Sequence, residues 1–347
     1  MNWAAVRSGR PARSLRAAVA FGTVVTGAST VARRRCQGRL RILLYHGVVS
    51  QREGPAAYGD LFMAASAFAR QMEHLKRRFR VLSLAEARER LSERRPFPDR
   101  AVVITFDDGY RNTLTVALPI LHALRLPVTV FVATELVGTG GLLWFDALRV
   151  LVARCAGTRQ ALELGCGIVV NGGTRRDPEA AFARHVATIS ELTAVEAATV
   201  RQRLTAMCME EDWVGCHPEL ALAEWDEWRR AAAGGLITVG SHGCTHGNLV
   251  RMNSAEQVEE LRRSKQTVER ELGQACWAIA YPYGAWDHHV TEAARAVGYL
   301  CGVTVDGGDN RSGADPLALR RTMVGDKGNF YLFAARASGL WERMPRW

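Results

Sequence analysis

Short apolar runs alternate with amphipathic segments along most of the chain. Continuous apolar runs, which predict buried strands, occupy residues 41–49, 101–106, 127–133, 236–239, 276–280 and 299–305. Apolar residues spaced three or four apart predict helices at 66–79, 114–124, 254–272 and 287–297, and the sequence SLAE at 83–86 predicts the start of a short helix. Strands that alternate with helices indicate a parallel sheet, open or closed.

One region interrupts this alternation. Residues 139–235 are rich in alanine and arginine and follow a mostly helical pattern, with a short predicted strand at 168–170 between glycine-containing turns. Roughly a hundred residues are too many for an ordinary connection between two core strands. We therefore expect a mostly helical subdomain at 139–235, inserted into a core formed by 41–138 and 236–330, with a C-terminal helix or tail at 331–347.

Composition indicates a globular protein whose positive charge is concentrated at one end. The chain has 347 residues, 48% of them hydrophobic, and a formal net charge of +10. Residues 1–41 hold nine arginines and no acidic residue, so the remainder is close to neutral. A neutral body does not favour nucleic-acid binding, and we expect none.

The basic N-terminal segment, 1–40, has an apolar centre at 17–32, which is shorter than the roughly 20 residues of a membrane span. Three interpretations remain open: a signal peptide, an amphipathic helix on a membrane surface, or a helix packed on the domain. Arginines on both sides of the apolar centre disfavour a clean cleavage site. We expect a cytoplasmic or membrane-associated protein rather than a secreted one, and under the second interpretation this segment makes peripheral membrane contact.

Eight cysteines are spaced irregularly and form no CxxC pair. In a chain of this length they are better interpreted as small buried residues in a reducing compartment than as a disulfide framework.

Two polar motifs follow predicted buried strands. His242 and His246 are four residues apart after one apolar run, and if the segment turns helical there, both rings lie on one face. Cys244, between them, is a weaker candidate ligand. Asp107 and Asp108 follow another apolar run, and carboxylates at the end of a buried strand need a partner. A divalent metal with an adjacent general base is one such arrangement.

Three motifs occur in a fixed order: TFDDGY at 105–110, SHGCTH at 241–246 and AYPYGAW at 280–286. Together they resemble the polysaccharide deacetylase family (the chitin-oligosaccharide deacetylase homology domain, carbohydrate esterase family 4), over residues 40–330 with the insert unmatched. The resemblance implies a distorted (β/α) barrel, one divalent metal, usually zinc, and removal of acetyl groups from N-acetylated sugars.

Carried over by position, the resemblance implies that Asp108, His242 and His246 are the metal ligands and Asp107 the general base. It also implies that a backbone N–H, that of Tyr283, stabilises the oxyanion. The other interpretation of residues 281–284 is an ordinary strand-to-helix turn.

The chain departs from the usual family pattern at two points. Ala280 stands where the family has an arginine that orients the base, and Arg320 or Arg321 is our candidate replacement. The late histidine motif that supplies the general acid is also absent. A family subgroup with an N-terminal Tyr-His pair, here Tyr45 and His46, places its acid there, so His46 is our candidate proton donor. A buried structural histidine is the alternative.

Aromatic residues near these motifs are candidates for sugar contact, namely Tyr281, Trp286 and Trp144, with core packing as the alternative. The sequence therefore predicts a metal-dependent carbohydrate N-deacetylase. The alternatives are a deacylase or amidase acting on a non-carbohydrate acylamide and a catalytically weak barrel that binds glycans. The oligomeric state is left open.

Overall fold

A parallel sheet forms the centre of the molecule. The computed structural model describes residues 38–51, 61–173, 177–324 and 329–339. The sheet has the strand order β11-β10-β9-β6-β5-β1-β12, and β4 pairs with the start of β5. The strands are β1 (Leu40–Tyr45), β4 (Arg80–Val81), β5 (Ala101–Phe106), β6 (Val128–Val132), β9 (Ile237–Ser241), β10 (Ala278–Ala280), β11 (Cys301–Val303) and β12 (Arg321–Met323).

A bridge between the two edge regions nearly closes this sheet into a barrel. Val303 of β11 pairs in parallel with Leu319, which lies just before β12. Alternate side chains of each strand point to opposite sides. One set, including Ile42, Val103 and Ala280, belongs to an apolar cluster inside the barrel. The other set, including Leu43 and Ile104, packs in a larger cluster with residues of the outer helices.

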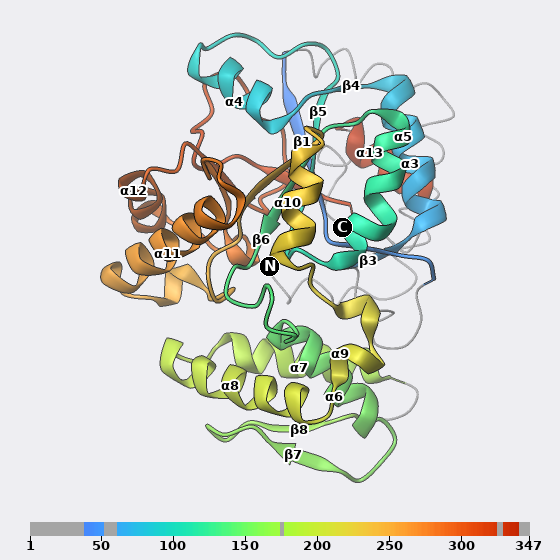
Figure 1. The fold of residues 1–347 in the computed structure, drawn as a ribbon, viewed down its shortest axis with the longest axis vertical. Helices are drawn as coiled ribbons and strands as arrows, with labels where there is room; N and C mark the ends of the chain where they lie inside the picture. Colours follow the sequence, from blue (N-terminus) through green and yellow to red (C-terminus); the bar gives the residue numbers. More distant parts are fainter. Residues whose placement is uncertain (1–37, 52–60, 174–176, 325–328, 340–347) are drawn as a thin grey trace.

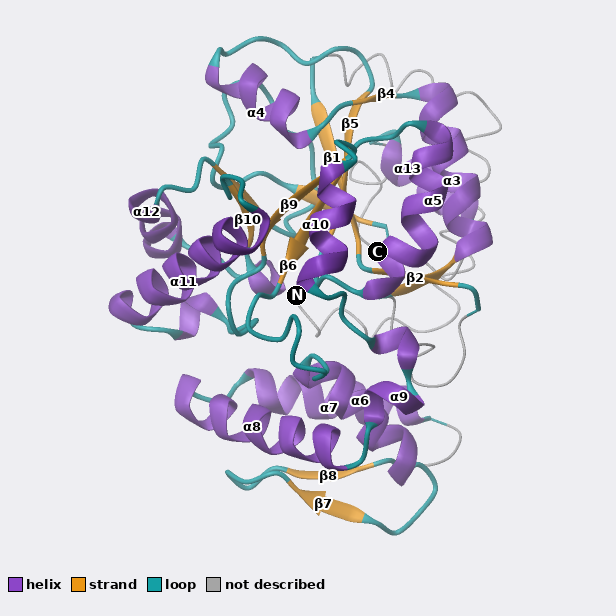
Figure 2. Cartoon of the chain, viewed as in Figure 1, coloured by secondary structure: helices purple, strands orange, loops and turns teal. Residues whose placement is uncertain are grey.

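Helices surround the barrel, as predicted (Figure 2). They are α3 (Ala65–Arg78), α4 (Leu84–Ser92), α5 (Leu118–Leu124), α10 (Trp225–Ala233), α11 (Ser254–Leu272), α12 (His288–Val297) and α13 (Phe330–Ala337), with a π-helical segment, η3 (Thr113–Ala117), leading into α5. Within the described residues, three short 3-10 segments are η4 (Pro218–Leu220), η5 (Leu249–Arg251) and η6 (Pro282–Gly284). Two further strands, β2 (Gly47–Val49) and β3 (Phe62–Ala64), pair with each other beside the barrel.

The region inserted after β6 forms a separate layer, at the bottom of Figure 1. It contains α6 (Trp144–Cys155), α7 (Pro178–Ser190), α8 (Ala194–Glu210), α9 (Trp213–Cys216) and an antiparallel hairpin of β7 (Ala161–Glu163) and β8 (Val169–Asn171). Its apolar core also includes Phe62, Tyr110 and Ala133 of the barrel. Helix α10, although within 139–235, packs against β9 and α11 of the barrel.

The predicted strands and helices are present, with local differences. The single strand expected at 41–49 is divided at His46, where β1 ends and β2 begins. The helix expected at 114–124 begins with the π-helical segment. No helix within the described ranges is long and apolar enough to cross a membrane. The predictions for the basic N-terminal segment lie outside the described residues, apart from Gly38–Leu40.

Most of the described cysteines are buried, as expected for small apolar residues. Five are buried and two, Cys166 and Cys216, are exposed, and all seven are free. Cys36 lies outside the described residues.

Candidate metal centre

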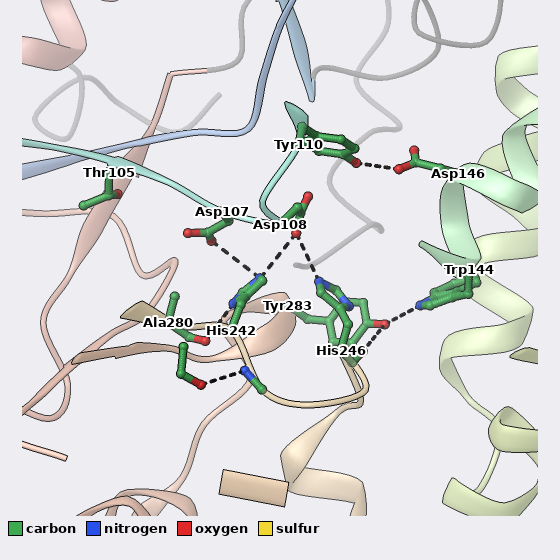
Figure 3. Close-up of polar contacts among 12 residues, drawn as sticks. Thr105, Asp107, Asp108, Tyr110, Trp144, Asp146, His242, His246, Ala280 and Tyr283 are labelled. Carbon is green, nitrogen blue, oxygen red and sulfur yellow. Dashed lines mark hydrogen bonds and ion pairs between the residues drawn. The ribbon is translucent and has the colours of Figure 1, made fainter. Parts of the chain in front are cut away.

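The polar residues of the predicted site meet because they follow parallel strands. The carboxyl ends of such strands open on the same end of a barrel. His46 follows β1, Asp107 and Asp108 follow β5, and His242 follows β9. All four line one pocket, together with His246 and Tyr283. Figure 3 shows the two aspartates facing the two histidines.

The backbone gives the two adjacent carboxylates different directions. Asp107 continues the alternation of β5, in which Val103 faces the barrel interior. Asp108 has φ of 75° and Gly109 has φ of 85°, so the chain turns sharply at these positions. A left-handed conformation at a residue other than glycine is uncommon and costs about 1–3 kcal/mol. As a result, Asp107 contacts Arg321, whereas Asp108 lies between His242 and His246.

The segment from His242 to His246 is a loop, so the condition that it turns helical is not met. His246 has φ of 54°. The Glu260 carboxylate of α11 accepts hydrogen bonds from the backbone N–H groups of Cys244 (2.9 Å) and Thr245 (2.6 Å). His242 Nδ1 donates to the carbonyl oxygen of Ala280 at 2.7 Å. Because a carbonyl only accepts, this bond leaves Nε2 of the neutral ring available as a ligand atom.

Two imidazole nitrogens converge on one carboxylate oxygen. His242 Nε2 and His246 Nε2 lie 3.4 Å and 3.3 Å from Asp108 Oδ1. Potential ligand atoms of the three side chains all lie within 4.8 Å of one another, and Asp108 is 2% exposed. The second oxygen of Asp108 is buried without a hydrogen-bond partner.

These features fit a divalent cation. Burial raises the pKa of Asp108, but its contacts with His242 and His246 outweigh that effect and hold the pKa well below its usual value. An ionised, buried carboxylate with one oxygen unpaired requires a compensating positive charge. Two histidines and one carboxylate form a ligand set that leaves coordination positions open. Cys244 is not part of this group of described side chains.

Asp107 has a different partner, the buried Arg321 of β12. Arg321 Nη1 donates to Asp107 Oδ1 at 2.6 Å and Nη2 donates to Oδ2 at 2.7 Å. Its Nε donates to the carbonyl oxygen of Thr304 at 2.8 Å. Burial raises the pKa of Asp107, but the charges of Arg321 and His242 reverse this, and the pKa is lowered. Of the two candidate arginines, Arg321 therefore contacts the aspartate, whereas Arg320 is exposed.

His46 lies in the same pocket as Asp107 and Asp108 and is partly buried. Burial lowers the pKa of its imidazole, and the two carboxylates oppose that change. The structure thus brings this histidine to the predicted site.

The three aromatic candidates for sugar contact differ in their surroundings. Tyr281 is 0% exposed and its hydroxyl donates to the carbonyl oxygen of Leu317 at 2.8 Å, so it belongs to the core and not to a sugar site. Trp286 is partly exposed and its indole donates to Asp306. Trp144 is 6% exposed, lines the pocket and donates to the Tyr283 hydroxyl at 2.7 Å. Tyr283 in turn donates to the carbonyl oxygen of His246 at 3.1 Å.

A buried network beside the site was not predicted. The Tyr110 hydroxyl donates to Asp146 at 2.6 Å, and Arg149 Nε donates to the same carboxylate at 3.0 Å. Both Asp146 and Arg149 are fully buried in α6. An acidic and a basic residue three positions apart in the apolar stretch 142–152 were the available signal, because such residues are rarely buried unless paired.

The chain is similar to known proteins in sequence and in fold. A family model described as "Polysaccharide deacetylase" matches residues 94–166 and 182–302. Poly-beta-1,6-N-acetyl-D-glucosamine N-deacetylase of Escherichia coli K12 is 43% identical over 49 residues. That match covers 14% of this chain and only 7% of the relative's length.

Solved structures share the fold over most of the chain. The Streptococcus pyogenes deacetylase PplD, in complex with acetate, has a TM-score of 0.57 and 19% identity, covering 88% of this chain and 99% of that one. IcaB from Ammonifex degensii has a TM-score of 0.56 and 20% identity, covering 86% and 97%. The predicted barrel type is confirmed.

Proposed function

We propose that this protein is a metal-dependent hydrolase that removes N-acetyl groups from a glycan. The premise is that the chain belongs to the polysaccharide deacetylase family, because the family model matches more than half of the chain's residues. One observation carries the proposal: Asp108, His242 and His246 form a buried, convergent ligand set beside Asp107. A divalent ion bound there, zinc being our proposal, supplies Lewis acidity to the acetamide carbonyl and lowers the pKa of nearby water.

Asp107 acts as the general base. Its carboxylate takes a proton from the water that attacks the acetyl carbon, and a positioned base of this kind typically contributes about 10²–10⁴-fold in rate. The bidentate contact with Arg321 fixes the orientation of this carboxylate and keeps it ionised. The backbone N–H of Tyr283 donates to the carbonyl oxygen as negative charge develops there.

His46 acts as the general acid. When the carbon–nitrogen bond breaks, its imidazolium gives a proton to the leaving nitrogen, because an amine anion is a very poor leaving group. The products are acetate and a free amino sugar.

The test is acetate release from a panel of N-acetylated oligosaccharides by zinc-loaded protein. We expect acetate in proportion to protein, and about 10²–10⁴-fold less with Asp107→Asn. In the same assay, His46→Gln should keep its metal, lose most turnover and change the alkaline limb of the pH–rate profile. A metal-loaded protein that releases no acetate from any glycan would sink the proposal.

A further inference from the structure

A groove extends from the catalytic pocket and runs between the insert and the barrel. The two cavities share Trp144, Tyr283, Gly284 and Val305 in their walls. The catalytic pocket has a volume of about 30 Å³, which is too small for a sugar ring. The groove has about 390 Å³, within the range of roughly 300–1,000 Å³ that is typical of ligand sites. A substrate whose acetyl group reaches Asp108 must therefore place its bulk outside the pocket, and the groove is the adjoining space.

Four charged side chains line the groove, and three of them have partners. Glu191 and Arg251 face each other across it, with Arg251 Nη2 3.3 Å from Glu191 Oε2. Asp306 accepts a hydrogen bond from Trp286 Nε1 at 2.9 Å. Arg201 of α8 is partly buried, and no carboxylate of the described residues lies within ion-pair distance of it.

Arg201 and Tyr283 line the same groove, and Tyr283 also lines the catalytic pocket. Tyr283 contacts the backbone of His246, so the groove that holds Arg201 reaches the residues around the reacting group. A guanidinium is always charged, and its planar fork matches a carboxylate or phosphate. Partial burial without a counter-charge favours a ligand that brings one.

We propose that Arg201 is a specificity-determining residue that binds an anionic group, a carboxylate or a phosphate, on the glycan next to the sugar that loses its acetyl group. This inference rests on the proposed function. The preferred substrate is thus an acidic N-acetylated glycan, whose charged group lies in the groove while the acetamide enters the pocket.

Matched substrates test this directly. One is an oligosaccharide of alternating N-acetylhexosamine and uronic acid, the second is the same compound with its carboxylates reduced to alcohols, and the third carries phosphate instead. Acetate release by the zinc-loaded full chain gives kcat/KM for each. Because a hydrogen bond to a charged group is strong, we expect the acidic compound to be favoured by about 10- to 100-fold over the reduced one.

Arg201→Gln should abolish this preference, mainly through KM, and leave turnover of the reduced compound within about threefold, since the charge contact serves binding. Arg203→Gln is the matched control, because Arg203 is an exposed arginine on the same helix that does not line the groove. The phosphate compound shows which anion is preferred.

Calorimetric binding to the metal-loaded Asp107→Asn variant separates this inference from the proposed function. The anion site is supported if the acidic compound binds this variant more tightly than the reduced compound does, and if adding Arg201→Gln removes the difference. This holds even if the wild type releases no acetate. Equal binding and equal kcat/KM for the acidic and reduced compounds overturn it, even if both are deacetylated. A preference that survives in Arg201→Gln overturns it as well.

Discussion

Asp107 and Asp108 are adjacent and have the same side chain, yet they contact different partners, which fits the different roles that we propose for them. Both carboxylate oxygens of Asp107 accept hydrogen bonds from the buried guanidinium of Arg321. Asp108 offers one oxygen to two imidazoles and keeps the other unpaired. The two side chains reach different partners because the backbone turns at Asp108, which has a left-handed conformation. At the scale of single residues, a base and a ligand should therefore be separable by substitution.

The first prediction concerns that separation. Asp107→Asn should keep its metal and lose about 10²–10⁴-fold in turnover, because the amide cannot accept the proton from water. Asp108→Asn should lose the metal itself, because a neutral amide is a much weaker ligand. Metal analysis and acetate release on the same samples measure both effects. Loss of metal in Asp107→Asn with retention in Asp108→Asn would mean that the two roles are exchanged.

The second prediction concerns Arg321. Lysine at this position keeps the charge but cannot make two parallel hydrogen bonds to Asp107. We expect Arg321→Lys to lower kcat about 10- to 100-fold, as is usual for partners that orient a catalytic group, with metal content unchanged. Arg320→Lys is the control, because that side chain is exposed. Wild-type kcat in Arg321→Lys would show that the bidentate contact does not position the base.

The choice between Arg320 and Arg321 shows what the sequence could not decide. The registration of β12 against β1 pairs Arg321 with Ile42, whose side chain faces the barrel interior. Directly paired residues point to the same side of a sheet, so Arg321 also points inward, toward Asp107. A one-residue shift would have turned Arg320 inward instead. That register depends on contacts between residues almost 280 positions apart, which no local pattern contains.

At the scale of elements, α6 of the insert is tied to the catalytic loops at two points. Its first residue, Trp144, binds the Tyr283 hydroxyl, and Asp146 binds the Tyr110 hydroxyl. Tyr283 has φ of 60°, a conformation that needs support from its surroundings. The helix therefore helps to hold the backbone that we propose as the oxyanion donor.

Trp144→Phe tests this support. Phenylalanine keeps an aromatic ring but removes the hydrogen bond, so the loop of Tyr283 should become less well positioned. We expect kcat to fall several-fold to tenfold, since small displacements of a positioned group are costly, with KM and metal content little changed. Trp277→Phe is the control, because Trp277 directly precedes β10, at the end of the strand away from Tyr283. A change in KM alone would favour the original prediction that Trp144 contacts the sugar.

The local patterns predicted most elements but not the contacts that shape the loops. The apolar runs predicted the barrel strands because buried parallel strands are apolar on both faces. The helical turn considered for His242–His246 does not form, and Glu260, from a separate helix, binds the backbone of this loop. Likewise, Tyr281 was expected to contact sugar, but the strand alternation places its ring in the outer core.

At the scale of the whole molecule, the site combines segments that are distant in the sequence. The proposed ligands follow β5 and β9, Arg321 comes from β12, and the groove has one wall from the barrel and one from the insert. The length and helical pattern of residues 139–235 predicted a mostly helical insert, although its last helix, α10, packs with the barrel. The sequence did not predict the groove, because the position of the insert depends on long-range contacts such as that between Tyr110 and Asp146.

This arrangement leads to a prediction for the stability of the whole protein. An ion that binds only the folded state raises its stability, by about 2.7 kcal/mol when free metal is at 100 times the dissociation constant. Because the proposed ligands follow two separate strands, they converge only in the native barrel. For a protein of this size, we expect a chelator to lower the wild-type Tm by roughly 3–8 °C and zinc to restore it. The double variant His242→Ala/His246→Ala should respond to neither addition, whereas His289→Ala, which changes an exposed histidine, should behave as the wild type. Scanning fluorimetry at one heating rate makes the comparison. A wild-type Tm that is the same with chelator and with zinc would contradict a metal site made of these ligands.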